Sequence, residues 1–308
     1  MFWGKSFNPE SDIPDLSGKV IIVTGGNTGL GKETCLQLAK HNPSHIYLAA
    51  RTASKAEAAI TDIKKALPSA PITHLSLDLT SFASIKNAAE TFTQASSRLD
   101  LLINNAGVMA MPFGTTEEGY EIQFGTNHVG HFLFTKLLLP TLLKTAEGPD
   151  ADVRIVNLSS EGHRLAPTGG LILDPAESEK KTGPWSRYGQ SKLSNILFTR
   201  QLAQRYPSIT AVAVHPGVIY TDLYGPSEKS NFIMRYGLGV LGPWVFGGVP
   251  QGAKNQLWAA TAPKAEVKSG AYYKPVGSLN AGSAYAQDEK LAAKLWDWSE
   301  EETKKHGF

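Results

Sequence analysis

Cysteine is nearly absent from the chain, which has Cys35 as its single thiol among 308 residues. One thiol cannot form an intrachain disulfide, so the cross-linked frameworks of many small secreted proteins are excluded. Zinc motifs built from several cysteines are excluded as well. We therefore predict a reducing compartment, the cytoplasm, and no bound metal. His128, His131 and His215 lack the spacing of a ligand set and are expected to be ordinary core or surface residues.

A strong charge imbalance and a long apolar run are also missing. The 30 basic and 28 acidic residues leave a formal net charge of +2, too small to attract nucleic acid or an anionic membrane. Residues 1–15 contain no uninterrupted apolar run of the kind found in a signal peptide. Residues 236–249 are apolar but too few to span a bilayer, and glycines interrupt them. We expect no nucleic-acid partner and no integral membrane span, while peripheral membrane contact and a homo-oligomer stay open.

Short β-branched runs alternate with helix-length amphipathic segments along most of the chain. This alternation is typical of βαβ units and predicts a parallel sheet. Val20-Ile21-Ile22-Val23 is continuously apolar, as expected for a strand buried on both faces. We predict a doubly wound α/β fold of the Rossmann type, with helices on both faces of the sheet. The predicted strands are residues 19–24, 45–50, 72–77, 100–103, 153–158, 210–214 and 270–274.

The chain is expected to form one dinucleotide-binding and catalytic domain, residues 17–308, after an N-terminal extension, residues 1–16. Residues 174–183 are polar and are predicted to be a surface loop. Residues 225–250 are apolar and rich in glycine, which indicates either a substrate lid or an ordinary buried segment. A charged helix with tryptophans is predicted near residues 288–305.

A glycine-rich turn follows the first predicted strand directly. Gly25, Gly29 and Gly31 have the spacing T-G-x-x-x-G-x-G, and a helical pattern begins after them. Glycines let a backbone approach a pyrophosphate closely, while the first N–H groups of the helix attract its charge. A strand-to-helix turn often needs glycine without any ligand, so this turn alone is weak evidence. The predicted contacts with a dinucleotide are those of Gly25, Asn27, Thr28, Gly29, Leu30 and Gly31.

The end of the second predicted strand indicates which dinucleotide is bound. Sites that prefer NAD place an acidic residue there, on the ribose hydroxyls. No acidic residue occurs from Thr34 through Ala56, and the strand is followed by Arg51. An arginine offers a 2′-phosphate a charge-assisted, bidentate pair. We predict NADP(H) as the cofactor; the alternative is that Arg51 is a solvated surface residue.

Further motifs follow in order, and together they resemble the short-chain dehydrogenase/reductase family over roughly residues 17–274. Within that family, Tyr188-Gly189-Gln190-Ser191-Lys192 and Ala213-Val214-His215-Pro216-Gly217 are most similar to the retinol-dehydrogenase-related branch. The resemblance implies an adenine contact at Asp78 and Leu79 and a cleft lined by Asn105, Ala106 and Gly107. It also implies a loop beside the nicotinamide formed by Pro216, Gly217, Val218 and Thr221.

The resemblance also implies a catalytic set of Asn127, Ser160, Tyr188 and Lys192. Asn127 falls where the family has a helix-kinking asparagine and is expected to hold a water that connects Lys192 to solvent. Ser159 and Ser160 both end the fifth predicted strand, and the family usually employs the later serine of such a pair.

The chemistry suits these residue types. A tyrosine hydroxyl can deliver a proton to a carbonyl oxygen that receives charge during hydride transfer. Its ordinary pKa of about 10 is too high for exchange near neutrality, and a nearby ammonium favours the phenolate. Lys192 lies one helical turn after Tyr188, on the same face. The resemblance also implies that Tyr188 and Lys192 contact the cofactor, Lys192 through the nicotinamide ribose hydroxyls.

The sequence therefore predicts an NADP(H)-dependent oxidoreductase acting on a ketone, aldehyde or alcohol, with a lipophilic small molecule as substrate. Two alternatives remain: a catalytically silent NADP(H)-binding protein, and a related enzyme that acts on a C=C bond or in a biosynthetic cyclisation. Met109, Met111 and Trp185 either line the substrate pocket or only pack.

Overall fold

The computed structural model describes residues 5–149, 151–217 and 248–308. Most of the predicted lid, residues 225–250, lies outside these ranges, as do the predicted cofactor contacts Val218 and Thr221. Among the described residues, no helix is long and apolar enough to cross a membrane.

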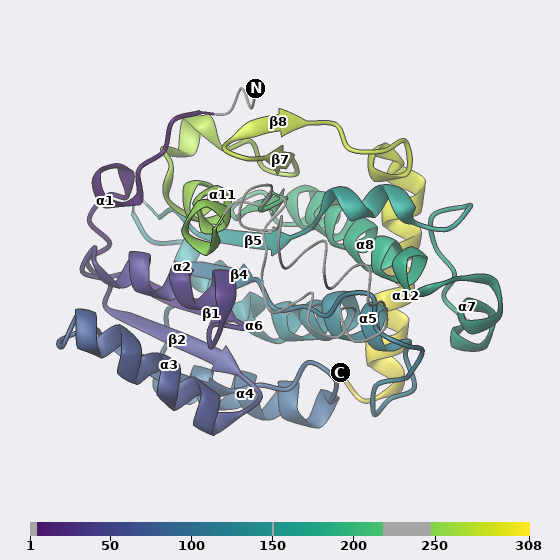
Figure 1. Cartoon of the computed structure of the whole chain (residues 1–308), viewed down its shortest axis with the longest axis horizontal. Helices are drawn as coiled ribbons and strands as arrows, with labels where there is room; N and C mark the ends of the chain where they lie inside the picture. The colour runs from purple at the N-terminus through teal and green to yellow at the C-terminus, as the bar shows by residue number, and fades with distance from the viewer. Residues whose placement is uncertain (1–4, 150, 218–247) are drawn as a thin grey trace, which may run out of the picture.

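An eight-stranded sheet runs through the centre of the molecule in the order β3-β2-β1-β4-β5-β6-β7-β8. In Figure 1, β2 lies toward the lower side of the molecule, and β7 and β8 lie at the top. All neighbouring strands are parallel except β7 and β8, which form an antiparallel pair. The strands are β1 (Val20–Thr24), β2 (His45–Ala50), β3 (Ile72–Ser76), β4 (Leu101–Asn104), β5 (Arg154–Leu158), β6 (Thr210–Val214), β7 (Tyr272–Lys274) and β8 (Ser278–Asn280).

Helices cover both faces, because the central strands are buried on both sides and carry apolar side chains toward each. Ile22 belongs to a buried cluster that includes side chains of α4, α6, α8 and α12, and Ile21 and Val23 belong to a second cluster with side chains of α2, α3 and α11. These helices are α2 (Gly29–Ala39), α3 (Ala53–Ala66), α4 (Phe82–Ala95), α6 (Gly130–Ala146), α8 (Pro184–Arg205), α11 (Val249–Thr261) and α12 (Glu289–Lys305). The predicted doubly wound α/β fold is confirmed.

Short helical segments make up the remaining helical structure of the described residues. They are α1 (Pro9–Asp12), α5 (Ile122–Phe124), α7 (Pro175–Lys181), the π-helical turn η1 (Gly125–Val129), and the 3₁₀ turns η2 (Glu161–Leu165), η4 (Lys264–Glu266) and η5 (Tyr285–Gln287). Helix α1 belongs to the N-terminal extension, whose Phe7, Ile13 and Leu16 are buried in the same cluster as α2 and α11.

Two elements differ from the sequence prediction. The predicted loop at residues 174–183 contains helix α7, because Asp174 caps it by accepting the Glu177 N–H at 3.0 Å and Pro175 begins it. Strand β8 was missed, since its residues Ser278–Asn280 pair only with the three residues of β7 and are too few for a periodic pattern.

A seam of buried polar side chains crosses the core where β4 and β5 pair. Asn104 donates to Asn157 Oδ1 at 2.8 Å and to Thr135 Oγ1 at 3.1 Å. Asn157 in turn donates to Thr199 Oγ1 at 2.9 Å. Thr135 lies on α6 and Thr199 on α8, so the seam joins the two central strands to both helices that cover them.

Candidate active site

The glycine turn between β1 and α2 leaves no room for a side chain at Gly26 or Gly31. Gly25 and Gly29 have φ of +64° and +50°, a region that favours glycine. A Cβ on Gly31 would lie 2.2 Å from the Gly25 carbonyl oxygen, so the first turn of α2 packs directly on the loop. The N–H groups at the start of α2 are therefore presented at the carboxyl edge of the sheet, where an anion would be stabilised.

The end of β4 is tied to this turn. Asn105 Nδ2 donates to the Thr24 carbonyl at 2.8 Å, and the Ala106 N–H donates to Thr24 Oγ1 at 2.9 Å. These bonds hold Asn105, Ala106 and Gly107 against the glycines, as the sequence prediction requires for a shared cleft.

A cavity of about 260 Å³ joins the turn to α8. It brings together most of the predicted cofactor contacts with the predicted catalytic pair. Its walls are formed by Gly25, Asn27, Thr28, Gly29, Leu30, Gly31, Asn105, Ala106, Gly107, Val108, Leu158, Ser159, Tyr188, Lys192 and Pro216.

A second cavity, of about 400 Å³, lies on the same edge of the sheet at the ends of β2 and β3. The two cavities share five lining residues, Gly25, Asn27, Ala106, Gly107 and Val108. Arg51 and Asp78 both line it, and the Arg51 Nε lies 3.7 Å from Asp78 Oδ2. The Arg51 side chain is 69% exposed, so this contact leaves the guanidinium accessible. Lys32, by contrast, pairs with Asp62 at 2.8 Å, away from the turn.

Tyr188 and Lys192 lie one turn apart on α8, and both are buried. The Lys192 Nζ lies 5.7 Å from the centre of the Tyr188 ring and donates to the Leu158 carbonyl at 3.1 Å. Burial lowers the pKa of Lys192 to about 8. The lysine is therefore held near the phenol by a backbone carbonyl, and no carboxylate of the described residues pairs with it.

Asn127 is fully buried in η1, where the helix widens between α5 and α6. Its Oδ1 accepts the Val108 N–H at 2.8 Å, and its Nδ2 donates to the Val108 carbonyl and to Ser191 Oγ at 2.9 and 2.8 Å. A Cβ on Gly107 would lie 3.0 Å from Asn127 Oδ1 and 3.3 Å from Lys192 Nζ. The asparagine thus fixes the wall beside Lys192, and both amide hydrogens are already used by the protein.

The two candidate serines have different environments. The Ser159 hydroxyl is buried and donates to the Lys192 carbonyl at 2.7 Å. Ser160 precedes η2, and its Oγ accepts the Gly162 N–H at 3.0 Å. A Cβ on Gly162 would lie 2.8 Å from the Tyr188 ring and 3.3 Å from Ser160 Oγ. Ser159 lines the cavity, and its hydroxyl supports α8 from within. Ser160 is not among the described residues that line the cavity, and its hydroxyl lies with the Tyr188 ring around Gly162.

The sequence did not reveal a charged cluster that holds the segment after Ser160. Glu161 accepts hydrogen bonds from Tyr272 Oη and Lys274 Nζ, both at 3.0 Å, and from Arg164 at 3.2 Å. Burial opposes ionisation of Glu161, but these donors outweigh it and lower its pKa to about 2. No sequence signal could have found the cluster, because Tyr272 and Lys274 lie on β7, far along the chain.

The predicted pocket residues also differ in their surroundings. Trp185 is 40% exposed, and its ring meets the Tyr188 ring edge-on with centres 6.3 Å apart. Met111 lines the second cavity, whereas Met109 is buried. Trp185 therefore borders Tyr188, Met111 borders the second cavity beside Arg51 and Asp78, and Met109 is buried.

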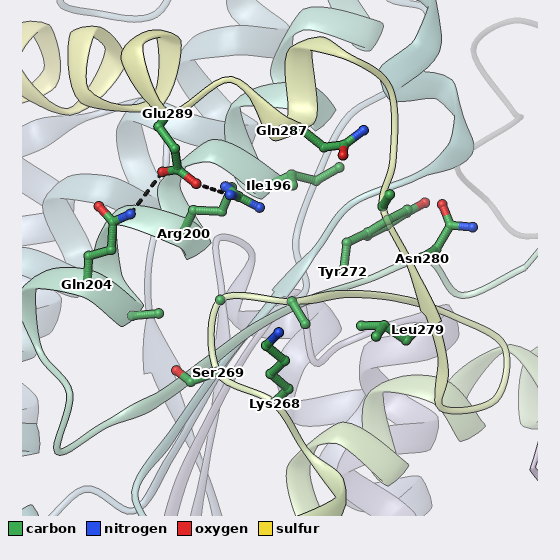
Figure 2. Close-up of a pocket in the computed structure, with 14 residues that line it drawn as sticks. Ile196, Arg200, Gln204, Lys268, Ser269, Tyr272, Leu279, Asn280, Gln287 and Glu289 are labelled. Carbon is green, nitrogen blue, oxygen red and sulfur yellow. Dashed lines mark hydrogen bonds and ion pairs between the residues drawn. The ribbon is translucent and has the colours of Figure 1, made fainter.

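A larger groove, of about 570 Å³, lies outside this site, between α8, β7, β8 and the start of α12. Figure 2 shows Glu289 between Arg200 and Gln204, and it accepts a hydrogen bond from each of them. The charges of Arg200 and Glu289 are thus matched within the groove, and none of the predicted catalytic residues lines it.

A sheet edge that joins a dinucleotide turn to a buried tyrosine–lysine pair defines a Rossmann-fold dehydrogenase or reductase. The family model described as short chain dehydrogenase matches residues 19–171. The chain is 39% identical to the short-chain dehydrogenase/reductase drtF of Aspergillus calidoustus, over 95% of this chain and 96% of that protein. It is 37% identical to retinol dehydrogenase 12 of Mus musculus, over 92% and 86%. The chain therefore belongs to the short-chain dehydrogenase/reductase family, and it is an oxidoreductase of that family.

The fold is shared with solved structures. A crystal structure of a protein from Mycobacterium paratuberculosis superimposes with a TM-score of 0.73 at 30% identity, covering 97% of this chain and 98% of that one. The single α/β domain with a nicotinamide-cofactor site, expected from the motifs, agrees with this family membership.

Proposed function

We propose that the chain is an NADP(H)-dependent oxidoreductase that interconverts a ketone or aldehyde with the corresponding alcohol. The observation that carries the proposal is the shared cavity, in which Tyr188 and Lys192 face the glycine turn across a continuous space. A dinucleotide bound at the turn would extend toward the tyrosine, so the cofactor and the acid–base group would serve one reaction.

The residues of the cleft fit a nicotinamide dinucleotide. Gly25 and Gly31 carry no side chains, so the backbone of the turn can approach a pyrophosphate closely. Gly107 likewise leaves the space beside Asn127 and Lys192 open. Asp78, Leu79 and Arg51 would hold the adenosine end, and Pro216, Gly217, Val218 and Thr221 the nicotinamide end. When bound, the cofactor supplies or accepts the hydride.

In the direction of reduction, the Tyr188 hydroxyl donates a proton to the substrate oxygen as negative charge develops on it. The Ser160 hydroxyl donates a hydrogen bond to the same oxygen and orients it. The Lys192 ammonium favours the phenolate that remains after the transfer. Asn127 forms hydrogen bonds to Ser191 and to the Val108 backbone, and these bonds fix the part of the cavity next to Lys192.

Arg51 supports NADP(H) over NAD(H), because its exposed guanidinium stands where an acid would contact the ribose of NAD. Arg51→Asp should weaken NADPH binding about ten- to a hundredfold and change NADH binding much less. Titration of both cofactors into the parent and the variant measures this, and a parent that prefers NADH would contradict the assignment.

The substrate class is supported by the relatives. The name retinol dehydrogenase 12 describes an enzyme acting on a lipophilic alcohol, and the apolar composition of residues 225–250 favours a substrate of that kind. Location in the cytoplasm stays a prediction from the near absence of cysteine.

Tyr188→Phe tests the mechanism, because it keeps the ring and removes the hydroxyl. On a panel of ketones, aldehydes and alcohols, turnover should fall by about 10²–10⁴-fold while NADPH still binds. Tyr206→Phe, in the residue that ends the same helix, is the matched control and should leave turnover unchanged. Full activity in Tyr188→Phe would contradict the mechanism, and product analysis would separate carbonyl reduction from reaction at a C=C bond.

A further inference from the structure

His131 lies at the start of α6, one turn after Asn127, and its ring is buried. Both ring nitrogens are engaged. The Nδ1 lies 3.0 Å from the Asn127 carbonyl oxygen, and the Nε2 lies 2.9 Å from Thr24 Oγ1. Thr24 immediately precedes the glycine turn. One imidazole ring therefore links the glycine turn to the π-helical segment that carries Asn127.

The partners of the ring allow only one arrangement of protons for a neutral histidine. A carbonyl can only accept, so Nδ1 carries the hydrogen and donates it to Asn127. Burial lowers the pKa of His131 to about 4, with a further contribution from the charge of Lys192, and the ring is neutral at pH 7. The Nε2 must then accept, and the Thr24 hydroxyl donates to it.

Thr24 completes the chain on the other side. Its hydroxyl oxygen accepts the Ala106 N–H at 2.9 Å. The hydroxyl also lies 3.5 Å from the Ile103 carbonyl, but His131 Nε2, at 2.9 Å, is the nearer acceptor for its hydrogen. Three hydrogen bonds therefore run in one direction, from the Ala106 N–H through Thr24 and His131 to the Asn127 carbonyl. Such buried chains specify geometry, because each polar group in them is satisfied within the protein.

The π-helical turn makes the Asn127 carbonyl a suitable end point. In η1 the hydrogen bonds span five residues, as between the Gly130 N–H and the Gly125 carbonyl, and this widened turn shifts the backbone pairing around Asn127. A side chain from the next turn can then reach the carbonyl, as His131 does.

We propose that His131 is a positioning residue that fixes Asn127 relative to the dinucleotide turn. This proposal rests on the proposed function. It assigns to His131 the task of holding the glycine turn, which would bind the cofactor, in a fixed position relative to Asn127 and Lys192. His131 does not line the cavity, so we assign its effect to its two hydrogen-bond partners, Thr24 and Asn127.

The first test replaces the ring without its nitrogens. His131→Phe should weaken NADPH binding, measured by fluorescence titration, about five- to fiftyfold and lower kcat by a similar factor. His128→Phe is the matched control, because His128 is also buried in η1 but bonds Ser299 on α12 instead of the turn. It should lose stability without loss of NADPH affinity.

The second test isolates the chain of bonds. Thr24→Val keeps the shape and removes the hydroxyl, while Thr24→Ser keeps the hydroxyl and should restore affinity and kcat. If His131 and Thr24 act through one chain, Thr24→Val should add little to the loss already present in His131→Phe. The ¹⁵N chemical shifts of the His131 ring, measured without cofactor, should report the tautomer protonated at Nδ1.

Additive losses in the double variant, an Nε2-protonated ring, or a His131→Phe variant that changes only stability would each overturn the proposal. If His131→Phe does not fold, Thr24→Val and the ring tautomer decide the question by themselves. A parent protein that binds no nicotinamide cofactor would refute the proposed function instead, and the tautomer and the coupling between Thr24 and His131, measured in the free energy of unfolding, would still test the chain.

Discussion

Lys192 should reduce the stability of the free protein even though the proposed reaction requires it. Its ammonium is buried, and burial lowers its pKa from 10.5 to about 8. Each tenfold change in an ionisation constant corresponds to about 1.4 kcal/mol, so the charged lysine costs about 3 kcal/mol at pH 7. Lys192→Met removes the charge and keeps the length of the side chain. The Leu158 carbonyl stays satisfied in the variant, because Asn195 Nδ2 also donates to it, at 2.9 Å.

We expect Lys192→Met to raise the free energy of unfolding by about 3 kcal/mol at pH 7 and to abolish turnover. Urea titrations at several pH values measure the first effect. Between pH 8 and 10.5 the unfolded state of the parent binds more protons than the folded state, so the stability of the parent rises with pH there. The advantage of the variant should therefore shrink to about 1 kcal/mol at pH 10.

Lys180→Met serves as the control, because Lys180 is exposed on α7 and its removal should change stability by less than about 0.5 kcal/mol at either pH. A Lys192→Met variant that is less stable than the parent, or whose gain is the same at pH 7 and pH 10, would refute the reasoning that burial penalises the ammonium.

Further outcomes follow from the site and its surroundings. Gly31→Ala should weaken NADPH binding by more than about tenfold in a fluorescence titration, because the added Cβ meets the Gly25 carbonyl oxygen. Ser160→Ala should lower kcat with little change in the midpoint of urea unfolding, whereas Ser159→Ala should lower that midpoint, since its hydroxyl supports α8 from within. Arg187→Met should cost about 3–5 kcal/mol in urea unfolding, because it leaves the buried Glu121 carboxylate without its cation.

The order of the elements could be read from the sequence, because buried parallel strands are continuously apolar and differ clearly from the amphipathic helices between them. The run Val20-Ile21-Ile22-Val23 became β1 almost as predicted. Helix α7 lies where the polar composition predicts a loop, although Asp174 and Pro175 are good helix-start residues. Strand β8 is too short for any periodicity, and only its pairing with β7 defines it.

The same limit applies to the site. Sequence spacing predicts that Tyr188 and Lys192 share one helical face and that the three glycines form one turn. Both predictions depend only on residues close together in the chain. The partners of Ser159 and Glu161 are not local, and neither could be derived from spacing. His131 was expected to be an ordinary core or surface residue, and only the fold shows which backbone and hydroxyl groups its two nitrogens meet.

The polar seam where β4 meets β5 has a consequence for how the sequence can diverge. Replacing Asn157 alone by an apolar residue removes both the acceptor for Asn104 and the donor to Thr199, so each single step leaves buried groups without partners. Replacing the whole set with apolar residues of matching shape avoids that cost, but it requires coordinated change on two strands and two helices. Descendants of this chain should therefore keep the seam intact or lose it as a unit, and intermediates that retain only half of it should be rare.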